Sequence, residues 1–390
     1  METTGAPPRP LSEVLPPLIL GTATFNVQYH PDPARMPYVD IVRRSLELGI
    51  NAFDTSPYYG PSEILLGQAL ERVTPRPRRE DYFLVTKAGR IAADEFDYSP
   101  AWVRYSVCRS LDRLGTPYLD LVYMHDAEFM PAAQVLAGVQ ELRRLRDQGL
   151  VRYVGISGYP VDVLASLAEA VLRETGEPLD AVLSYGHFCL QNTRLGSPAL
   201  LERFRLAGVA CVLNASMLNM GLLTSRGAHN GPMASWHPAP ASLRRACHDL
   251  AAVAARHGER LERVAIRWAL ENWARDGAMF GTTAYGGGVR IGASVMGVTA
   301  VAELDETWDL WRGVVRLLGG ATDEAAADRR DKIASIVRDE MWPSLGRWKD
   351  HAWESGGEAF VNARDQFGVI PRDEVAERWG LVPGAGALKL

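Results

Sequence analysis

The sequence has few cysteines, no long apolar run and no large excess of charge of either sign. Its four cysteines form no CxxC pair and fall within predicted helices or strands, which indicates buried thiols in a reducing compartment. No segment reaches the roughly 18 apolar residues of a membrane span, and the first residues lack the hydrophobic stretch of a secretory signal. The net charge of −5 over 390 residues offers no surface for a polyanion. We therefore expect a cytoplasmic protein without nucleic-acid or membrane partners.

Several catalytic signatures are also missing from the sequence. The eight histidines show neither HxH nor HExxH spacing, so no metal site is expected. There is no GxSxG elbow for a serine nucleophile. No GxGxxG opens a helix after a strand, which disfavours a doubly wound nucleotide-binding domain.

Short apolar runs alternate with amphipathic segments along most of the chain, the order typical of a parallel α/β fold. Val135, Val139, Leu142 and Leu145, for example, recur at helical spacing before Gly149, which would end that helix. Eight apolar runs are enough to close a (β/α)8 TIM barrel. The predicted strands are residues 18–21, 50–54, 82–87, 119–125, 151–157, 181–184, 210–215 and 294–297.

Around this barrel, assigned to residues 18–320, the chain carries additions. Residues 1–17 are Pro-rich and predicted to be an irregular tail, whereas 321–390 form a Trp-rich C-terminal extension expected to pack on the barrel. An extension that shapes the substrate mouth is the alternative. Residues 274–292 contain a Gly-rich insertion, predicted to be a flexible loop, with a substrate lid as the alternative. The last three residues, 388–390, faintly echo a peroxisomal signal, but a frayed tail is favoured.

Three early strands each end at or just before a titratable side chain, where a parallel barrel keeps its chemistry. These residues are Asp54 with Tyr59 in INAFDTSPYYG, Lys87 in YFLVTKAG and His125 in DLVYMHDAEF. Together they suggest hydride transfer at a carbonyl or carbinol carbon, with Tyr59 moving the proton. A phenol has an ordinary pKa of about 10, so Lys87 would favour the phenolate, Asp54 would keep Lys87 charged, and His125 would orient the substrate oxygen.

Each of these four residues also has a structural explanation. Asp54 precedes good turn chemistry, Lys87 could be a solvated strand end, Tyr59 is one of 13 tyrosines, and His125 could be a hydrogen-bonded core histidine. Because all four occur together at this spacing, we favour the catalytic interpretation.

In this combination the chain resembles the aldo-keto reductase family. The resemblance runs from about Leu18 to Leu318 and includes the later motifs VGIS, GLLT and VAIRWAL. The stretches YMHDAEF, LSYGHF and LNASMLNMGLLT are similar to the branch of sugar 1-dehydrogenases acting on D-arabinose and L-galactose. The resemblance implies an oxidoreductase that uses a nicotinamide coenzyme and a sugar substrate, as a monomer or weak homo-oligomer.

The resemblance also implies coenzyme contacts. Ser157 matches a position that holds the nicotinamide carboxamide, although Gly158 follows it where asparagine is usual. Ser184 replaces an amide-bearing residue, and Ala215 replaces an aromatic that stacks on the nicotinamide ring. The long loop from 217 to 240 could fold over the coenzyme. The implied contacts are Ser157, Ser184, Ala215, Ser216 and Leu218 near the nicotinamide, and Gly297, Glu303, Glu306 and Thr307 near the adenosine.

The residues near the adenosine predict NAD rather than NADP as the coenzyme. Family members that prefer NADP place a cation at the positions of Gly297 and Glu303, where it pairs with the 2′-phosphate. Here one residue is glycine and the other an acid. The structural alternative for Glu303 is a favourable place in the first turn of its helix. If both coenzymes were used equally, Arg290 would be the first candidate for phosphate binding.

From these residues and the resemblance we expect an NAD-dependent aldose 1-dehydrogenase. It would oxidise the anomeric carbon of a pyranose of the D-arabinose or L-galactose type to a lactone. One alternative is a reductase of an aromatic or polyketide carbonyl, which a hydrophobic funnel lined by the Trp-rich extension would favour. Another is a regulatory subunit that binds nicotinamide coenzyme.

Overall fold

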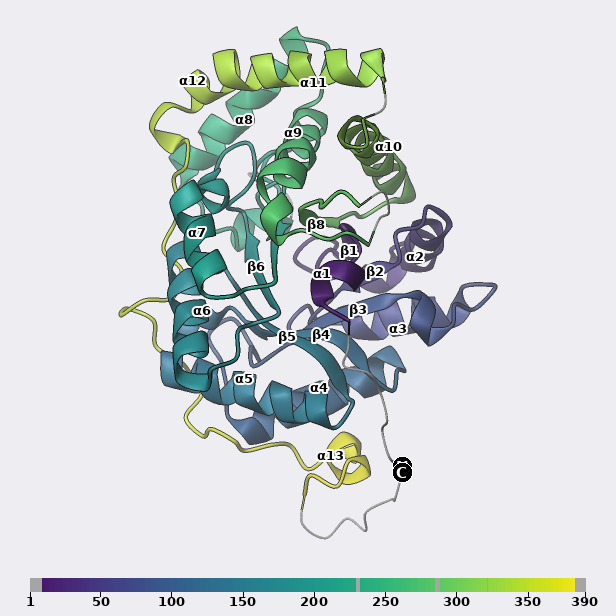
Figure 1. Ribbon diagram of the computed structural model, residues 1–390, viewed down its shortest axis with the longest axis vertical. Helices are drawn as coiled ribbons and strands as arrows, with labels where there is room; N and C mark the ends of the chain where they lie inside the picture. The colour runs from purple at the N-terminus through teal and green to yellow at the C-terminus, as the bar shows by residue number, and fades with distance from the viewer. Residues whose placement is uncertain (1–8, 229–231, 285–287, 321, 383–390) are drawn as a thin grey trace.

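Eight parallel strands close into a barrel in the computed structural model, which describes residues 9–228, 232–284, 288–320 and 322–382 (Figure 1). Each strand pairs with the next in the chain, and the last pairs with the first through four residue pairs from Leu18↔Ser294 to Gly21↔Gly297. The predicted (β/α)8 fold is confirmed. The strands are β1 (Leu18–Gly21), β2 (Ala52–Asp54), β3 (Phe83–Ala88), β4 (Leu119–His125), β5 (Val151–Gly158), β6 (Ala181–Tyr185), β7 (Cys211–Ala215) and β8 (Ala293–Gly297).

Helices surround the barrel, and their ends follow local sequence signals. The predicted helix before Gly149 is α5 (Ala132–Asp147), and Gly149 has a left-handed φ of 78° that residues with a Cβ rarely adopt. In the same way, Ser99 caps the start of α4 (Pro100–Leu114), and Gly115 stops this helix with a φ of 61°. The other barrel helices are α2 (Tyr38–Glu47), α3 (Ser62–Arg72), α4 (Pro100–Leu114), α6 (Val161–Thr175), α7 (Pro198–Leu206), α8 (Ala241–Arg256), α9 (Leu261–Asp276) and α10 (Val301–Leu318).

Alternation of side chains along each strand separates two apolar layers. In β4, Leu121 and Tyr123 belong to the layer inside the barrel, whereas Val122 and Met124 pack against the helices. The same alternation carries His125, the last residue of β4, to the inner side at the mouth of the barrel. Barrel geometry therefore decides which strand-final residues can meet.

The N-terminal end of the barrel is closed by the segment that precedes β1. Residues 1–17 were predicted to be irregular, but Leu11–Val14 form a short helix, α1. Leu11 and Leu15 are buried in the inner apolar layer, and the Tyr153 hydroxyl donates a hydrogen bond to the carbonyl of Arg9 at 2.5 Å. Periodicity could not reveal this helix because it has only four residues.

The insertion predicted at 274–292 lies at this same closed end. Thr282 and Ile291 form an antiparallel bridge, and the backbone N–H of Thr283 donates to the carbonyl of Ser12 beside α1. Residues 285–287 lie outside the described part. Because the rest packs at the end opposite the strand C-termini, the alternative of a substrate lid is wrong for the described residues.

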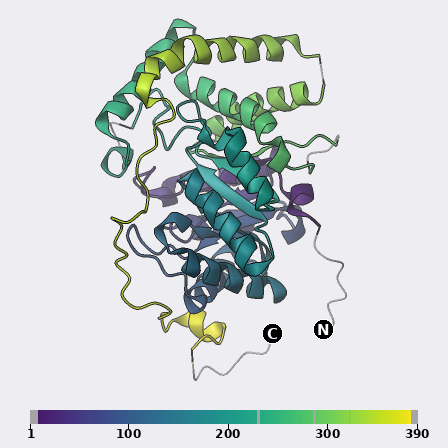
Figure 2. The same cartoon turned by 60° about the vertical axis from the view of Figure 1, so that its left-hand side comes forward.

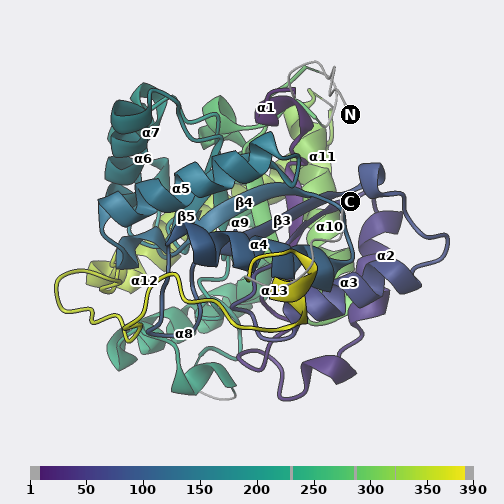
Figure 3. The same cartoon turned by 90° about the horizontal axis from the view of Figure 1, so that it is seen from below.

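Within residues 322–382, the C-terminal extension adds three α-helices and an extended segment. Helix α11 (Glu324–Ile336) packs on α9, and α12 (Trp342–Leu345) packs on α8. Residues 349–370, here named the strap, then run along the side of the barrel to α13 (Glu374–Arg378), which lies beside α4 (Figures 2 and 3). The tripeptide 388–390 lies outside the described residues.

The strap is fixed to the barrel at both ends. Asp350 accepts hydrogen bonds from the backbone and hydroxyl of Thr193 at 2.7 and 2.9 Å. Further along, the Asn362 side chain bonds both the N–H and the carbonyl of Phe96. These contacts hold the segment between them across the mouth of the barrel.

Candidate active site

The four predicted catalytic residues line one cavity of about 490 Å³ at the C-terminal ends of the strands. Asp54 is the last residue of β2, Tyr59 lies in the turn that follows it, Lys87 is in β3 and His125 ends β4. The sequence therefore identified residues that the fold brings together. Their roles remain predictions that rest on the geometry below.

Lys87 and Asp54 form a buried ion pair beneath Tyr59. The Lys87 Nζ lies 2.6 Å from Asp54 Oδ1 and donates to the Thr55 carbonyl at 3.0 Å. It also lies 4.8 Å from the centre of the Tyr59 ring. Burial lowers the pKa of Lys87, but Asp54 and Tyr59 outweigh it and hold that pKa above its ordinary value. Lys87 is thus a cation at neutral pH.

Two opposing effects act on the Tyr59 hydroxyl. Burial raises the pKa of Tyr59 above its ordinary value of 10.0, and the charge of Lys87 opposes this rise. The cation therefore makes the phenolate easier to form than burial alone would allow. A nearby cation that favours the phenolate is one feature of a proton-transferring tyrosine.

His125 faces Tyr59 across the cavity. The two ring centres are 5.6 Å apart, with the ring planes perpendicular. Burial lowers the pKa of His125 to about 3, although the neighbouring Asp126 carboxylate raises it. The imidazole is therefore neutral at physiological pH, and its Nδ1 lies 3.0 Å from the Ser56 hydroxyl.

Arg90 and Asp126, which the sequence reading missed, also line this cavity. They form an ion pair, and Arg90 donates to the Tyr58 hydroxyl at 3.1 Å. Asp126 has a left-handed φ of 55°, an uncommon conformation that often marks functional turns. The sequence signal available for them was their position. Asp126 comes one residue after His125, and Arg90 comes three residues after Lys87.

Glu128 explains why glycine follows Ser157. A Cβ at Gly158 would lie 2.2 Å from Glu128 Oε2, so the buried carboxyl group occupies the space that a side chain would need. Glu128 Oε1 accepts hydrogen bonds from the Tyr159 backbone at 3.1 Å and from the Ser355 hydroxyl at 2.8 Å. Burial and the charge of Asp126 raise the pKa of Glu128 to about 8.

The strap supplies one wall of the cavity through Trp353, Glu354, Ser355 and Gly356. The Trp353 ring stacks on Tyr159 with ring centres 4.6 Å apart and planes inclined by 13°. The alternative in which the extension shapes the mouth therefore matches the described residues.

The loop after β7 covers another side of the cavity. Trp236 and Pro238 line it, and the Trp236 indole N–H donates to the Gln28 carbonyl at 3.1 Å. Trp236 also meets Tyr29 edge to face, with ring centres 5.6 Å apart. This contact joins the loops that follow β1 and β7 over the mouth.

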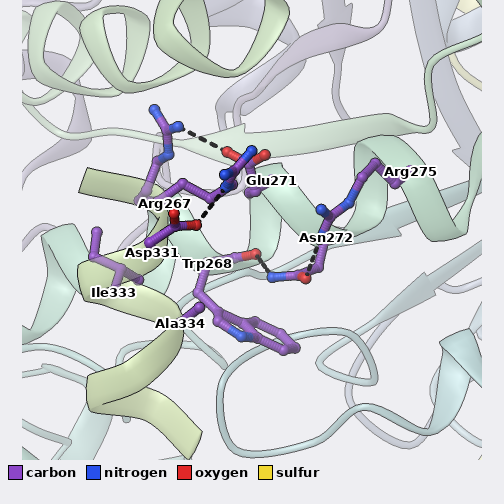
Figure 4. A pocket seen from close by; sticks show the side chains of 9 residues that line it. Arg267, Trp268, Glu271, Asn272, Arg275, Asp331, Ile333 and Ala334 are labelled. Atoms are coloured by element: carbon purple, nitrogen blue, oxygen red, sulfur yellow. Dashed lines mark hydrogen bonds and ion pairs between the residues drawn. The ribbon is translucent and has the colours of Figure 1, made fainter. Parts of the chain in front are cut away.

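A second, smaller hollow of about 150 Å³ lies between α9 and α11 and shares no residue with the catalytic cavity (Figure 4). Its centre is the buried ion pair of Arg267 with Glu271, 2.7 Å long. Arg267 also donates to the Leu310 carbonyl of α10. A Cβ at Gly313 would lie 2.6 Å from this guanidinium, so the glycine makes room for it. The contacts of Arg267 with Leu310 and Gly313 join α9 to α10, which is a structural role.

Comparison with known proteins agrees with this geometry. The model of the aldo/keto reductase family matches residues 17–313. The chain belongs to the aldo/keto reductase family. It is 43% identical over 264 residues to D-arabinose 1-dehydrogenase of Saccharomyces cerevisiae, covering 67% of this chain and 77% of that protein. It is 32% identical over 309 residues to L-galactose dehydrogenase of Arabidopsis thaliana, covering 78% of this chain and 86% of that protein.

The fold has also been seen in solved structures. A crystal structure of a Pseudomonas aeruginosa protein classed with the aldo-keto reductases aligns with a TM-score of 0.51. Sequence identity is 22%, and the alignment covers 79% of this chain and 94% of the other. At this identity the likeness concerns the barrel alone.

This aldo/keto reductase is thus an oxidoreductase that uses a nicotinamide coenzyme. Among the described residues no helix has the length and apolar character of a membrane span. Over the same part of the chain, no cluster of three or more His, Cys, Asp or Glu side chains could hold a metal ion.

One wall of the cavity is nearly free of side chains and fits a flat ring. Gly21 and Gly297 are paired neighbours at the ends of β1 and β8. Both line the cavity together with Ala215 and Ser216. Ser216 has a left-handed φ of 59°, which turns the chain sharply after β7. Gly21, Gly297, Ala215 and Ser216 could hold a nicotinamide ring on backbone and small side chains rather than on an aromatic ring.

The structure does not bring three of the other predicted nicotinamide contacts to the cavity. Ser184 lies between Leu183 and Tyr185, which line the cavity, so its side chain points to the opposite face of β6. The Ser157 hydroxyl donates to the Met124 carbonyl at 3.4 Å. Leu218 packs against the outer apolar layer. Alternation along β6 could have excluded Ser184 from the sequence alone.

At the adenosine end, the predicted residues are engaged with one another or with nearby side chains. Glu303 accepts hydrogen bonds from the backbone and hydroxyl of Thr299 at 2.7 and 3.0 Å, which caps the start of α10. The Thr307 hydroxyl donates to the Glu303 carbonyl. Glu306 forms ion pairs with Arg260 and Arg263. The structural alternative for Glu303 was a place in the first turn of its helix, and Glu303 lies in the first turn of α10.

Arg290 lies far from these residues. Its guanidinium donates to the Met279 carbonyl and is near enough to Cys211, the first residue of β7, to lower its thiol pKa against the effect of burial. That places Arg290 at the closed end of the barrel. As a candidate for phosphate binding, Arg290 is wrong.

Proposed function

We propose that this enzyme oxidises the anomeric carbon of a cyclic aldose to a lactone, with NAD as the hydride acceptor and Tyr59 as the proton acceptor. The observation that carries the proposal is the Lys87–Asp54 ion pair of 2.6 Å beneath the Tyr59 ring. Two relatives named for oxidation of D-arabinose and L-galactose support the sugar as substrate.

Each residue of the tetrad has one task in this reaction. The aldose loses a proton from its anomeric hydroxyl and a hydride from the same carbon. Tyr59 takes the proton as phenolate, and Lys87 stabilises that phenolate with its charge. Asp54 keeps Lys87 protonated and directed upward, while His125 holds the reacting oxygen in place. The bound nicotinamide supplies the acceptor for the hydride.

The walls around the tetrad suit a small polyhydroxylated ring. Arg90, Asp126 and Glu354 offer charged groups to hydroxyls, and Trp353 offers an aromatic face. This mixture of polar groups and aromatic surface supports a monosaccharide over an entirely apolar substrate.

A second candidate is the reductase of an aromatic carbonyl. The same cavity is lined by Tyr29, Tyr58, Phe129 and Trp236 besides Trp353. These rings would bury an aromatic substrate well. The tetrad would then act in the reverse direction, with Tyr59 donating its proton to the carbonyl oxygen.

A substrate panel separates these candidates. We expect purified enzyme with NAD to oxidise aldopyranoses of the D-arabinose or L-galactose type and to release the lactone, identified by mass spectrometry. Tyr59→Phe keeps the ring but removes the proton carrier, so turnover should fall by about 10²–10⁴-fold while coenzyme binding persists. Reduction of aromatic ketones without oxidation of any aldose would establish the second candidate instead.

Coenzyme preference tests the adenosine end. Gly297 carries no cation, and Glu303 is an acid that would repel a 2′-phosphate but accept hydrogen bonds from a free ribose hydroxyl. We expect kcat/KM with NAD to exceed that with NADP by at least about tenfold, a difference of about 1.4 kcal/mol.

Charge reversal at Glu303 probes this preference directly. Glu303→Arg should reduce the ratio of kcat/KM with NAD to kcat/KM with NADP. Asp309→Arg, which makes the same charge change farther along α10 at an exposed position, is the matched control and should leave the ratio unchanged. Equal use of both coenzymes by the unmodified enzyme would contradict the assignment of NAD.

A further inference from the structure

Ser56 connects the turn before Tyr59 to the imidazole of His125. Its side chain is fully buried, two residues after Asp54. The Ser56 oxygen accepts a hydrogen bond from the Tyr58 backbone N–H at 3.1 Å and lies 3.0 Å from His125 Nδ1. One hydroxyl thus joins the segment that carries Tyr59 to the ring on the opposite side of the reacting atoms.

The direction of the second hydrogen bond follows from counting protons. A backbone N–H can only donate, so the Ser56 oxygen is the acceptor toward Tyr58. Its own hydroxyl proton then needs an acceptor. Among the described residues, His125 Nδ1 is the acceptor within reach. If the Ser56 hydroxyl donates to His125 Nδ1, that nitrogen carries no proton.

The other ring nitrogen must then hold the proton of the neutral imidazole. His125 Nε2 lies 3.6 Å from Asp126 Oδ2, and a carboxylate at this distance favours N–H over a lone pair. Arg90 holds Asp126 in place through their ion pair. Both His125 and Asp126 line the cavity that would hold the substrate.

We propose that Ser56, assisted by Asp126, fixes His125 as the Nε2–H tautomer, so that the imidazole meets the reacting oxygen as a hydrogen-bond donor. The opposite tautomer would turn a lone pair toward the substrate oxygen and repel it. Ser56 is a positioning residue, because it acts through His125. Its effect on catalysis rests on the proposed function, but the tautomer itself does not.

The tautomer can be read without any substrate. Long-range ¹H–¹⁵N spectra of the histidine-labelled enzyme distinguish the two nitrogens, and comparison with His125→Asn assigns the signal. We expect His125 to show a protonated Nε2 and an unprotonated Nδ1 near neutral pH. A protonated Nδ1 in the unmodified enzyme would overturn the proposal.

Variants connect the tautomer to catalysis. Ser56→Ala removes the donor and should mix the two tautomers, with kcat falling at least about tenfold and coenzyme affinity unchanged. Ser56→Thr keeps the hydroxyl and should restore both the Nε2–H signal and kcat. If Ser56→Ala kept a pure Nε2–H signal and full kcat, Ser56 would have no such role.

Asp126→Asn gives an independent measurement. Asparagine tolerates the left-handed backbone at this position, so the fold should persist while the charge opposite Nε2 is lost. We expect partial loss of the Nε2–H signal, and an unchanged spectrum would remove Asp126 from the proposal. If every sugar failed as substrate, the proposed function would fall while these spectra would still decide the tautomer.

Discussion

At the scale of single residues, the site is a balance between burial and charge. Lys87 is only 2% exposed and Asp54 only 5%, so their attraction is weakly screened by water. The half-buried tyrosine above them gains a cation at close range. Removing the charge of one of these residues should therefore also change the pKa values of its neighbours.

Replacing Lys87 with methionine tests this balance. Because Lys87 opposes the effect of burial, its loss should raise the pKa of Tyr59 further and reduce the phenolate present at any given pH. We expect sugar oxidation to fall by about 10²-fold or more near neutral pH and to recover partly as the pH rises. The measurement is kcat/KM from pH 6 to 10, with coenzyme affinity as the control for folding. A pH profile that kept its shape would show that Lys87 does not tune Tyr59.

Sequence could predict the tetrad because each member lies at or just after a strand end. Ser56 and Glu128 could not be found in the same way. Their significance depends on which side chain lies opposite, as when Glu128 fills the space beside Gly158. Such pairings form only when neighbouring strands are in register.

At the scale of elements, the strands were the most predictable part. β1 and β4 have the predicted bounds, and the other six differ by one or two residues at their ends. Apolar runs buried on both faces carry a strong sequence signal. The strap carries none: Ser355 meets Glu128 across 227 residues, and no local pattern encodes so distant a contact.

Trp353 should decide affinity for substrate rather than the rate of the chemical step. It lines the cavity from the strap but contributes no proton or charge. We expect Trp353→Ala to raise KM for the sugar by about fivefold and to leave kcat within about twofold, since a lost stacking contact is worth about 1 kcal/mol.

Trp348 provides the matched control for this substitution. It lies just before the strap, meets His351 and does not line the cavity. Trp348→Ala should therefore leave KM unchanged. Equal effects of the two substitutions would indicate general loosening of the strap instead of a substrate contact.

At the scale of the whole molecule, the two ends of the barrel have different tasks. The strand C-termini surround the cavity, while α1 and the insertion close the opposite end. In this architecture the closed end serves stability and the open end serves chemistry. Changes at the two ends should therefore have separable consequences.

Leu11→Ala tests that separation. Leu11 is 1% exposed inside the closed end, and a buried Leu→Ala change costs about 2–5 kcal/mol of unfolding free energy. We expect a lower urea midpoint with kcat per folded molecule unchanged. Glu13→Ala, at an exposed position of the same helix, should change neither. A loss of kcat in stable, folded Leu11→Ala would show that the ends are coupled.

The strap also sets an order of events during synthesis. A chain leaving the ribosome presents β1 to β8 and the tetrad well before residues 353–356, and domains fold as they emerge. A chain that ended near residue 348 would contain all four residues of the tetrad but would lack the wall of the cavity that residues 353–356 supply. We expect such a shortened chain to discriminate less well between substrates than the complete chain does.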